Sequence, residues 1–145
     1  MRVTRSLFAL PLLLVAAFVA GQFSRADVSA QPAPAAKVYE LRTYYTHPGK
    51  LADLHTRFRD HTVRIFEKHG MTNVGYWVPQ DEPAHSNTLI YVLAHESRAA
   101  AKKSWDAFRE DPEWRKVKAA SEANGPIVTK VDSVFMDAAD YSALK

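Results

Sequence analysis

The sequence contains no cysteine at any of its 145 positions. This absence excludes disulfide bonds, thiolate metal sites, cysteine nucleophiles and a lipid-modified cysteine behind a leader. The H-E-x-x-H zinc motif, the G-x-S-x-G nucleophile elbow, the phosphate loop and the dinucleotide fingerprint are also missing. The sequence therefore gives no support to metalloprotease, serine hydrolase or nucleotide-dependent chemistry.

The sequence also lacks a surplus of one charge once its first 30 residues are set aside. Arg2, Arg5, Arg25 and Asp27 precede Gln31, which leaves 16 basic and 15 acidic side chains in the rest of the chain. A nucleic-acid or anionic-membrane footprint needs a clear basic excess. We therefore expect no nucleic-acid partner.

The apolar run of residues 7–20 is shorter than the roughly 20 residues that cross a bilayer comfortably. Arg2 and Arg5 precede it and small residues follow it at 28–30, which is typical of a signal peptide. We expect a signal peptide over residues 1–30, export to the periplasm or the extracellular space, and no stable membrane insertion of the mature chain. An uncleaved anchor and a mitochondrial presequence are the alternatives.

Residues 31–36, QPAPAA, read as a short extended linker ahead of a domain at 37–137 and a tail at 138–145. Period-two alternation and helical spacing define the elements of that domain. Strands are predicted over 38–46, 72–78, 88–95 and 127–136, and helices over 51–69 and 98–123, the second with a restart at Asp111.

This order predicts an α+β fold, the ferredoxin-like β-α-β-β-α-β domain with an antiparallel four-stranded sheet. Two helices cover only one face of such a sheet, yet apolar side chains occur on both sides of the predicted strands. An exposed apolar face of this size normally belongs to an interface. We therefore predict a homodimer whose two sheets pack together as a dimeric α/β barrel.

Several short motifs carry a family resemblance, and they are spread over about Val38–Phe135. They are Tyr39-Glu40-Leu41-Arg42-Thr43-Tyr44, Pro48-Gly49-Lys50, His69-Gly70-Met71, Gly75-Tyr76-Trp77 and Asp111-Pro112-Glu113-Trp114. In these motifs the chain resembles the NIPSNAP family. The resemblance implies the dimeric α/β-barrel form of the ferredoxin-like fold and no defined activity. Related barrels include cofactor-free monooxygenases, lactone isomerases and haem-handling enzymes.

Glu40 and Arg42 alternate onto one face of the first strand. A buried carboxylate and guanidinium must be paired or bound to something. They predict either a salt bridge, within one chain or across a dimer, or an anion-binding pocket. Lys130 and Asp132 of the last strand could complete either network.

Six histidines invite a metal hypothesis, which their spacing disfavours. His55 and His61 point about 120° apart on a helix, and His55 and His69 lie about 21 Å apart along it. We expect no metal site. His61 could instead project between helix and sheet as a pocket acid or base, or be an ordinary hydrogen-bonded boundary residue.

Trp77, Tyr91 and Trp105 could line a cleft for a flat ligand, or simply be core residues. The leading functional hypothesis is a module, without a cofactor, that binds a small apolar ligand or a protein partner. The competing hypothesis is a cofactor-independent monooxygenase or isomerase acting on an apolar aromatic or lactone-like substrate. His61 would then shuttle a proton and Arg42 would hold an anionic oxygen. Haem binding through a histidine is a third possibility.

Overall fold

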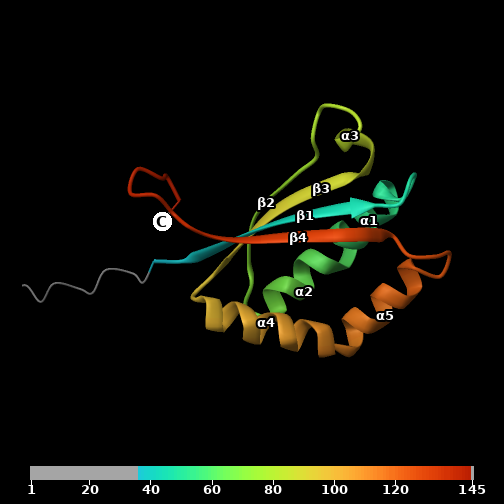
Figure 1. Ribbon diagram of the computed structural model, residues 1–145. Helices are drawn as coiled ribbons and strands as arrows, with labels where there is room; N and C mark the ends of the chain where they lie inside the picture. The colour runs from blue at the N-terminus through green and yellow to red at the C-terminus, as the bar shows by residue number, and fades with distance from the viewer. Residues whose placement is uncertain (1–35, 145) are drawn as a thin grey trace, which may run out of the picture. The chain divides into compact units, whose positions relative to one another are not determined.

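In the computed structural model, which describes residues 36–144, four antiparallel strands form one sheet with the longer helices on one side of it (Figure 1). The strands are β1 (Val38–Thr46), β2 (Thr72–Trp77), β3 (Thr88–His95) and β4 (Val128–Asp137), in the spatial order β2-β3-β1-β4. The expected signal peptide and residues 31–35 of the expected linker lie outside the described residues.

The helices are α1 (Leu51–Arg57), the π-helical turn η1 (Phe58–Thr62), α2 (Val63–Lys68), the short α3 (Ala84–Asn87), α4 (Arg98–Glu110) and α5 (Pro112–Ser121). The α+β, ferredoxin-like order of elements predicted from the sequence is confirmed. None of the helices in the described part of the chain is both long and apolar enough to cross a bilayer.

The sequence chemistry explains where the helices begin and end. Ser97 caps α4, because its hydroxyl accepts the backbone N–H of Ala100 at 3.0 Å. Asp111 caps α5 by accepting the N–H of Glu113 at 2.7 Å, and Pro112 follows at the first helical position. The first helical stretch ends at Gly70, whose φ of 75° suits a residue without a side chain.

The first helical stretch differs from the single regular helix predicted for it. Residues 58–62 form a π turn inside the stretch, and the Thr62 hydroxyl donates to the Arg57 carbonyl at 3.1 Å. A π turn holds more residues than an α turn, so side chains around it point in other directions than a 3.6-residue repeat predicts. This turn carries His61.

The helix-covered face of the sheet holds the core. Tyr91 lies at its centre, fully buried, and aromatic rings from the first helical stretch and from neighbouring strands surround it. Its ring centroid is 5.3 Å from that of Phe58, 5.9 Å from Phe66 and 5.4 Å from Tyr44. Edge and tilted contacts of this kind stabilise an aromatic cluster beyond the area that it buries.

The other face of the sheet, called the open face below, carries no helix of residues 36–144 in front of its centre (Figure 1). The strand register places mostly apolar side chains on it: Leu41, Thr43, Trp77, Ile90, Val92, Val134 and Met136. Trp77 and Val134 are 52% and 55% exposed. The Trp77 ring lies over Gly75, where an added Cβ would fall 2.5 Å from it.

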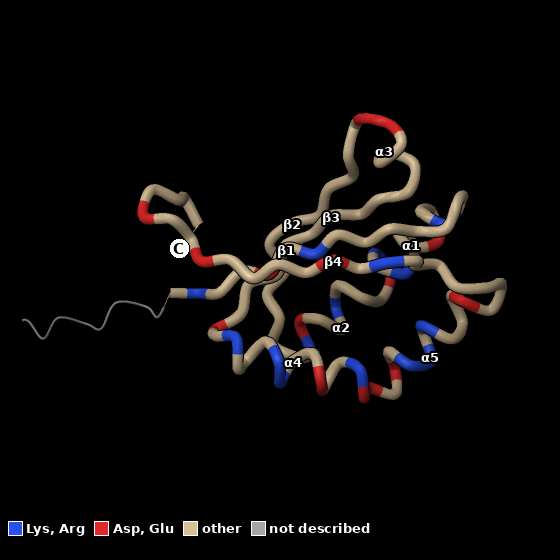
Figure 2. The backbone as a smooth tube through the Cα atoms, in the orientation of Figure 1, with Lys and Arg blue, Asp and Glu red and all other residues tan. Residues whose placement is uncertain are grey.

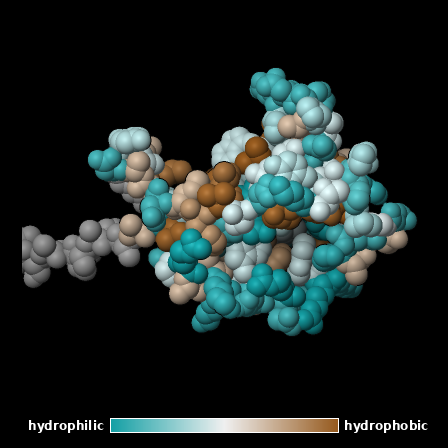
Figure 3. Space-filling model, viewed as in Figure 1, coloured by the Kyte–Doolittle hydropathy of each residue, from teal (hydrophilic) through white to brown (hydrophobic). Residues whose placement is uncertain are grey.

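Two segments rise on the open side of the sheet, at its opposite ends (Figure 1). One is the connection between β2 and β3, and the other is the tail after β4. The tail lies beside Tyr39, Trp77 and Met136, with which it lines a shallow cavity of about 360 Å³. Apolar side chains gather between these two segments, above the hydrophilic residues of α4 and α5 (Figure 3).

Candidate functional site

The carboxylate of Glu40 is buried inside the domain, where its residue is only 1% exposed. Four side chains from four different elements contact its two oxygens. They are Arg42 Nη1 at 2.6 Å, Ser133 Oγ at 2.7 Å, Trp105 Nε1 at 2.7 Å and His95 Nε2 at 3.1 Å. The salt bridge expected between Glu40 and Arg42 is therefore present within one chain.

These contacts keep the Glu40 carboxyl ionised. Burial alone would raise its pKa, but the four hydrogen-bond donors outweigh burial and lower the pKa from 4.5 to about 2. An ionised carboxylate only accepts hydrogen bonds, so Nε2 of His95 must carry the proton that points to it. The network is thus a fixed negative charge that every neighbour donates to.

This network lies at the floor of a cleft between the sheet and α4, which we call the Arg42 cleft. The cleft has a volume of about 410 Å³ and is lined by Glu40, Arg42, Arg98, Lys102, Trp105, Arg109 and Phe135. The Arg42 guanidinium lies 4.2 Å from the centre of the Trp105 ring, and that of Arg98 lies 4.2 Å from the Phe135 ring. Two cation–π pairs therefore hold the walls of the cleft.

Part of the cleft could have been found in the sequence. Arg98, Lys102, Trp105 and Arg109 are spaced by four, three and four residues, which places them on one side of α4. Figure 2 shows that charged residues are concentrated along α4 and α5. By contrast, His95 and Ser133 are 55 and 93 residues from Glu40, and no local pattern links them to it.

The expectation that Lys130 and Asp132 complete the Glu40 network is wrong. Strand pairing places Asp132 beside Thr43 and Lys130 beside Tyr45, on the open face. These two residues pair with each other there, at 2.8 Å. Ser133, the next residue along the strand, is the one that points to Glu40.

Trp77 and Tyr91 do not share a cleft. Tyr76, not Trp77, stands opposite Tyr91 in the register of β2 and β3, and the two rings stack at 5.3 Å. Trp77 therefore lies on the open face, whereas Tyr91 of β3 and Trp105 of α4 are buried between the sheet and the helices. Burial raises the pKa of the Tyr91 hydroxyl well above its usual range, so this group stays protonated.

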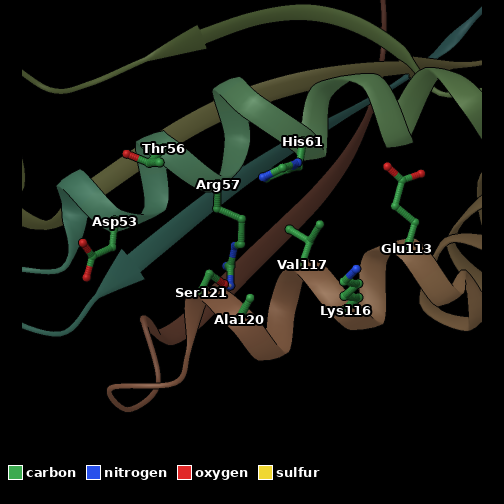
Figure 4. Close-up of a pocket in the computed structure, with 9 residues that line it drawn as sticks. All are labelled: Asp53, Thr56, Arg57, His61, Glu113, Lys116, Val117, Ala120 and Ser121. Carbon is green, nitrogen blue, oxygen red and sulfur yellow. The ribbon is translucent and has the colours of Figure 1, made fainter.

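His61 does not project between helix and sheet, so of the two readings left open by the sequence the pocket acid or base between these layers is wrong. It is exposed and lines a separate groove of about 570 Å³ between the first helical stretch and α5. Figure 4 shows Arg57 reaching across this groove toward Ser121, with His61 on the same side, above Val117. Arg57 contacts Ser121 Oγ at 3.3 Å and Glu122 Oε1 at 3.0 Å.

The structure thus separates the residues that the sequence proposed for one site. Glu40 and Arg42 belong to the Arg42 cleft, His61 to the groove beside α5, Trp77 to the open face and Tyr91 to the core. Within residues 36–144, no three His, Asp or Glu side chains are arranged to hold a metal ion.

Comparison with known proteins gives a family and a fold. The NIPSNAP family model matches residues 39–143. A crystal structure of a NIPSNAP family protein of unknown function from Agrobacterium tumefaciens superposes with a TM-score of 0.66 at 21% identity, covering 77% of this chain and 96% of that one. No curated protein sequence matches this chain.

Two further crystal structures have the same architecture. A NIPSNAP-like domain protein from Burkholderia xenovorans has a TM-score of 0.65 at 15% identity, over 74% of this chain and 90% of that one. SnoaB, a cofactor-independent oxygenase from Streptomyces nogalater, has a TM-score of 0.51 at 14% identity, over 75% and 99%. At these identities the likeness concerns the fold.

Proposed function

This chain belongs to the NIPSNAP family, and we propose that it works as a homodimeric binding module that holds a small organic molecule in the Arg42 cleft. The observation that carries the proposal is a buried, fully ionised carboxylate under an open cleft. Apolar side chains of similar volume would stabilise such a site as well or better. A buried carboxyl with a strongly lowered pKa beside a cleft is typical of a binding site.

The size and lining of the Arg42 cleft support the same proposal. A volume of about 410 Å³ lies within the range of roughly 300–1,000 Å³ that small-molecule sites occupy. The cleft combines aromatic walls with a few fixed polar groups, which is the usual composition of such sites.

The open face supports the homodimer. Its centre is apolar, so two copies related by a twofold axis would place apolar side chains against apolar side chains. The β2–β3 connection and the tail flank that centre, and the tail adds two exposed apolar residues, Tyr141 and Leu144. A second copy seated between the two flanks would cover Trp77 and Val134.

Native mass spectrometry of the mature chain purified from its own cells tests this function. We expect a dimer with additional mass bound to it. Lys102→Trp should fill the mouth of the cleft and remove the bound mass without touching the Glu40 network. Lys103→Trp is the matched control, because Lys103 is exposed on the same helix and does not line the cleft. A ligand that survives Lys102→Trp would contradict the assignment.

Cofactor-independent oxygenation or isomerisation is the competing function, which the fold of SnoaB supports only as architecture. His61 and Arg42 line separate cavities, so they do not face one substrate within a single chain. Oxygen uptake with 1,4-dihydroxynaphthalene measures this alternative. Uptake above the uncatalysed rate that is lost in Lys102→Trp would favour it over simple binding.

Export remains part of the proposal. Its support is the pair Arg2 and Arg5 followed by the apolar run of residues 7–20. Fractionation of cells followed by mass measurement should find the protein outside the cytoplasm, shortened by about the first 30 residues. A full-length protein in the cytoplasmic fraction would overturn this part.

A further inference from the structure

Positive charge predominates in the Arg42 cleft. Four cations line it, and two carboxylates, Glu40 and Asp106, lie within reach of those cations. The four are Arg42, Arg98, Lys102 and Arg109. Counting Asp106 with the lining, the cleft therefore has two more positive than negative charges.

The position of each carboxylate shows which cations it satisfies. Glu40 is buried at the floor and bonded to Arg42 and to three further donors. Asp106 lies on the outer side of α4 and pairs with Lys102 at 2.7 Å and with Arg109 at 2.5 Å. Neither carboxylate contacts Arg98.

Arg98 is the cation that remains. No carboxylate of residues 36–144 pairs with it, and its guanidinium rests on the ring of Phe135. It is also the first residue of a 13-residue helix, where the helix dipole adds positive potential. Deeper in the cleft, Nε of Arg42 is buried without a partner among the described residues.

We propose that the Arg42 cleft takes a small organic acid, with its carboxylate against Arg98 and its apolar body against Phe135 and Trp105. This inference deepens the proposed function and depends on it. A guanidinium presents a planar fork of donors that matches a carboxylate in a bidentate manner. A neutral apolar ligand would instead desolvate the Arg98 charge without supplying a hydrogen-bond acceptor or a counterion, which is unfavourable.

The same geometry argues against a polyanion. The unpaired charge is confined to a cleft of about 410 Å³, whereas binding to a nucleic acid or a membrane requires a basic surface that extends over many contacts. The chain from Gln31 onward is close to neutral. A single anionic group on a compact molecule fits the cleft better.

A pair of probes that differ in charge tests the inference. 2-Naphthoate and 2-naphthylmethanol have the same ring system, but only the first is an anion. By titration calorimetry at low salt, we expect 2-naphthoate to bind at least tenfold more tightly. Arg98→Gln should weaken 2-naphthoate about tenfold and leave 2-naphthylmethanol unchanged. Arg115→Gln, an exposed cation on α5 outside the cleft, is the control and should change neither probe.

The outcomes separate the two proposals. If both probes bind equally and Lys102→Trp abolishes the binding of both, the ligand need not be an acid, but the proposed binding module is supported. Failure of 2-naphthoate to bind at millimolar concentration would also contradict an organic acid as the ligand. Native mass spectrometry of the purified protein would still test whether it binds a small molecule at all. Tight binding of 2-naphthoate that Arg98→Gln does not weaken would show that Arg98 is not the anion contact.

Discussion

The two faces of the sheet differ in what completes them. The helix-covered face is closed by α1, α2, α4 and α5 of the same chain and encloses both an aromatic core and an ion network. The open face carries a comparable row of apolar side chains, yet Trp77 and Val134 on it are half exposed. Alternation places apolar side chains on both faces at once, but α1, α2, α4 and α5 cover only one of them.

The comparison shows why the polar groups are on one side. Inside the covered face, water is excluded and each hydrogen bond to Glu40 is strengthened by its surroundings. On the open face the only charged pair near the centre, among the described residues, is the solvated Lys130–Asp132 pair. The covered face is therefore suited to binding a polar ligand, and the open face to binding another apolar surface.

The largest expected difference between the faces is in folding stability. Phe66→Ala should lower the free energy of unfolding by about 3–5 kcal/mol, because it empties the centre of the aromatic core. Val134→Ala on the open face should cost about 0.5 kcal/mol or less in the dilute, monomeric protein. Urea unfolding followed by circular dichroism measures both. Equal costs would mean that the open face is buried in the monomer.

The second largest expected effect is a loss of folding stability in acid, which arises from the covered face. The pKa of Glu40 is about 2 in the folded state and 4.5 in the unfolded state, so the unfolded state binds more protons between these values. The contribution of the ionised Glu40 to the free energy of unfolding is complete above pH 4.5 and is lost as the pH falls toward 2. A shift of this size corresponds to about 3 kcal/mol.

Glu40→Gln is the variant that checks this acid dependence. Unfolding measured across pH 2–5 should show a shallower slope in Glu40→Gln than in the parent protein. Some slope should remain, because hydrogen bonds from Lys68 and His69 hold the pKa of Asp111 well below its usual range. An unchanged slope would show that Glu40 is not the group that titrates.

A charge on the open face should break the proposed homodimer, with a smaller effect on folding. Val134→Lys should raise the dimer dissociation constant at least tenfold, since it buries an ammonium group against apolar side chains. Val131→Lys is the matched control, because Val131 is on the same strand opposite Tyr44 and points to the other face. Sedimentation velocity distinguishes the two. A dimer that survives Val134→Lys would place the interface elsewhere.

The smallest expected loss of folding stability comes from the start of α4, which packs on the covered face. Ser97→Ala removes the cap at the start of α4 and should cost about 1 kcal/mol of stability. Ser142→Ala in the tail is the comparison and should cost nothing measurable. Thermal unfolding of the two variants checks the difference, and equal midpoints would show that the cap is dispensable.

Much of the fold could be predicted from the sequence, because strand alternation, capping residues and helix-ending glycines are local signals. Alternation also predicts that Tyr76 and Trp77 lie on opposite faces of the sheet. Alternation does not say which face of one strand matches which face of the next, since a shift of one residue exchanges them. The break in register between Asn73 and Gly75 decides this for β2 and β3, because Tyr76 and Trp77 follow it.

The candidate site was predictable only where it was local. Glu40 and Arg42 are two residues apart, so their pairing could be expected, whereas His95 and Ser133 reach Glu40 only through the complete sheet. The sequence left the position of His61 open between a pocket and a boundary, and a regular helical repeat does not foresee the π turn of residues 58–62 that carries it. The roles of these residues in binding or catalysis stay predictions.

The Glu40 network also bears on the timing of folding. Arg42 is two residues from Glu40, but the other three partners are 55, 65 and 93 residues away, so the complete network requires loop closure over most of the domain. During synthesis the carboxylate must wait for Ser133 on the last strand. A ligand that recognises the finished cleft would therefore bind complete domains and pass over nascent or truncated chains.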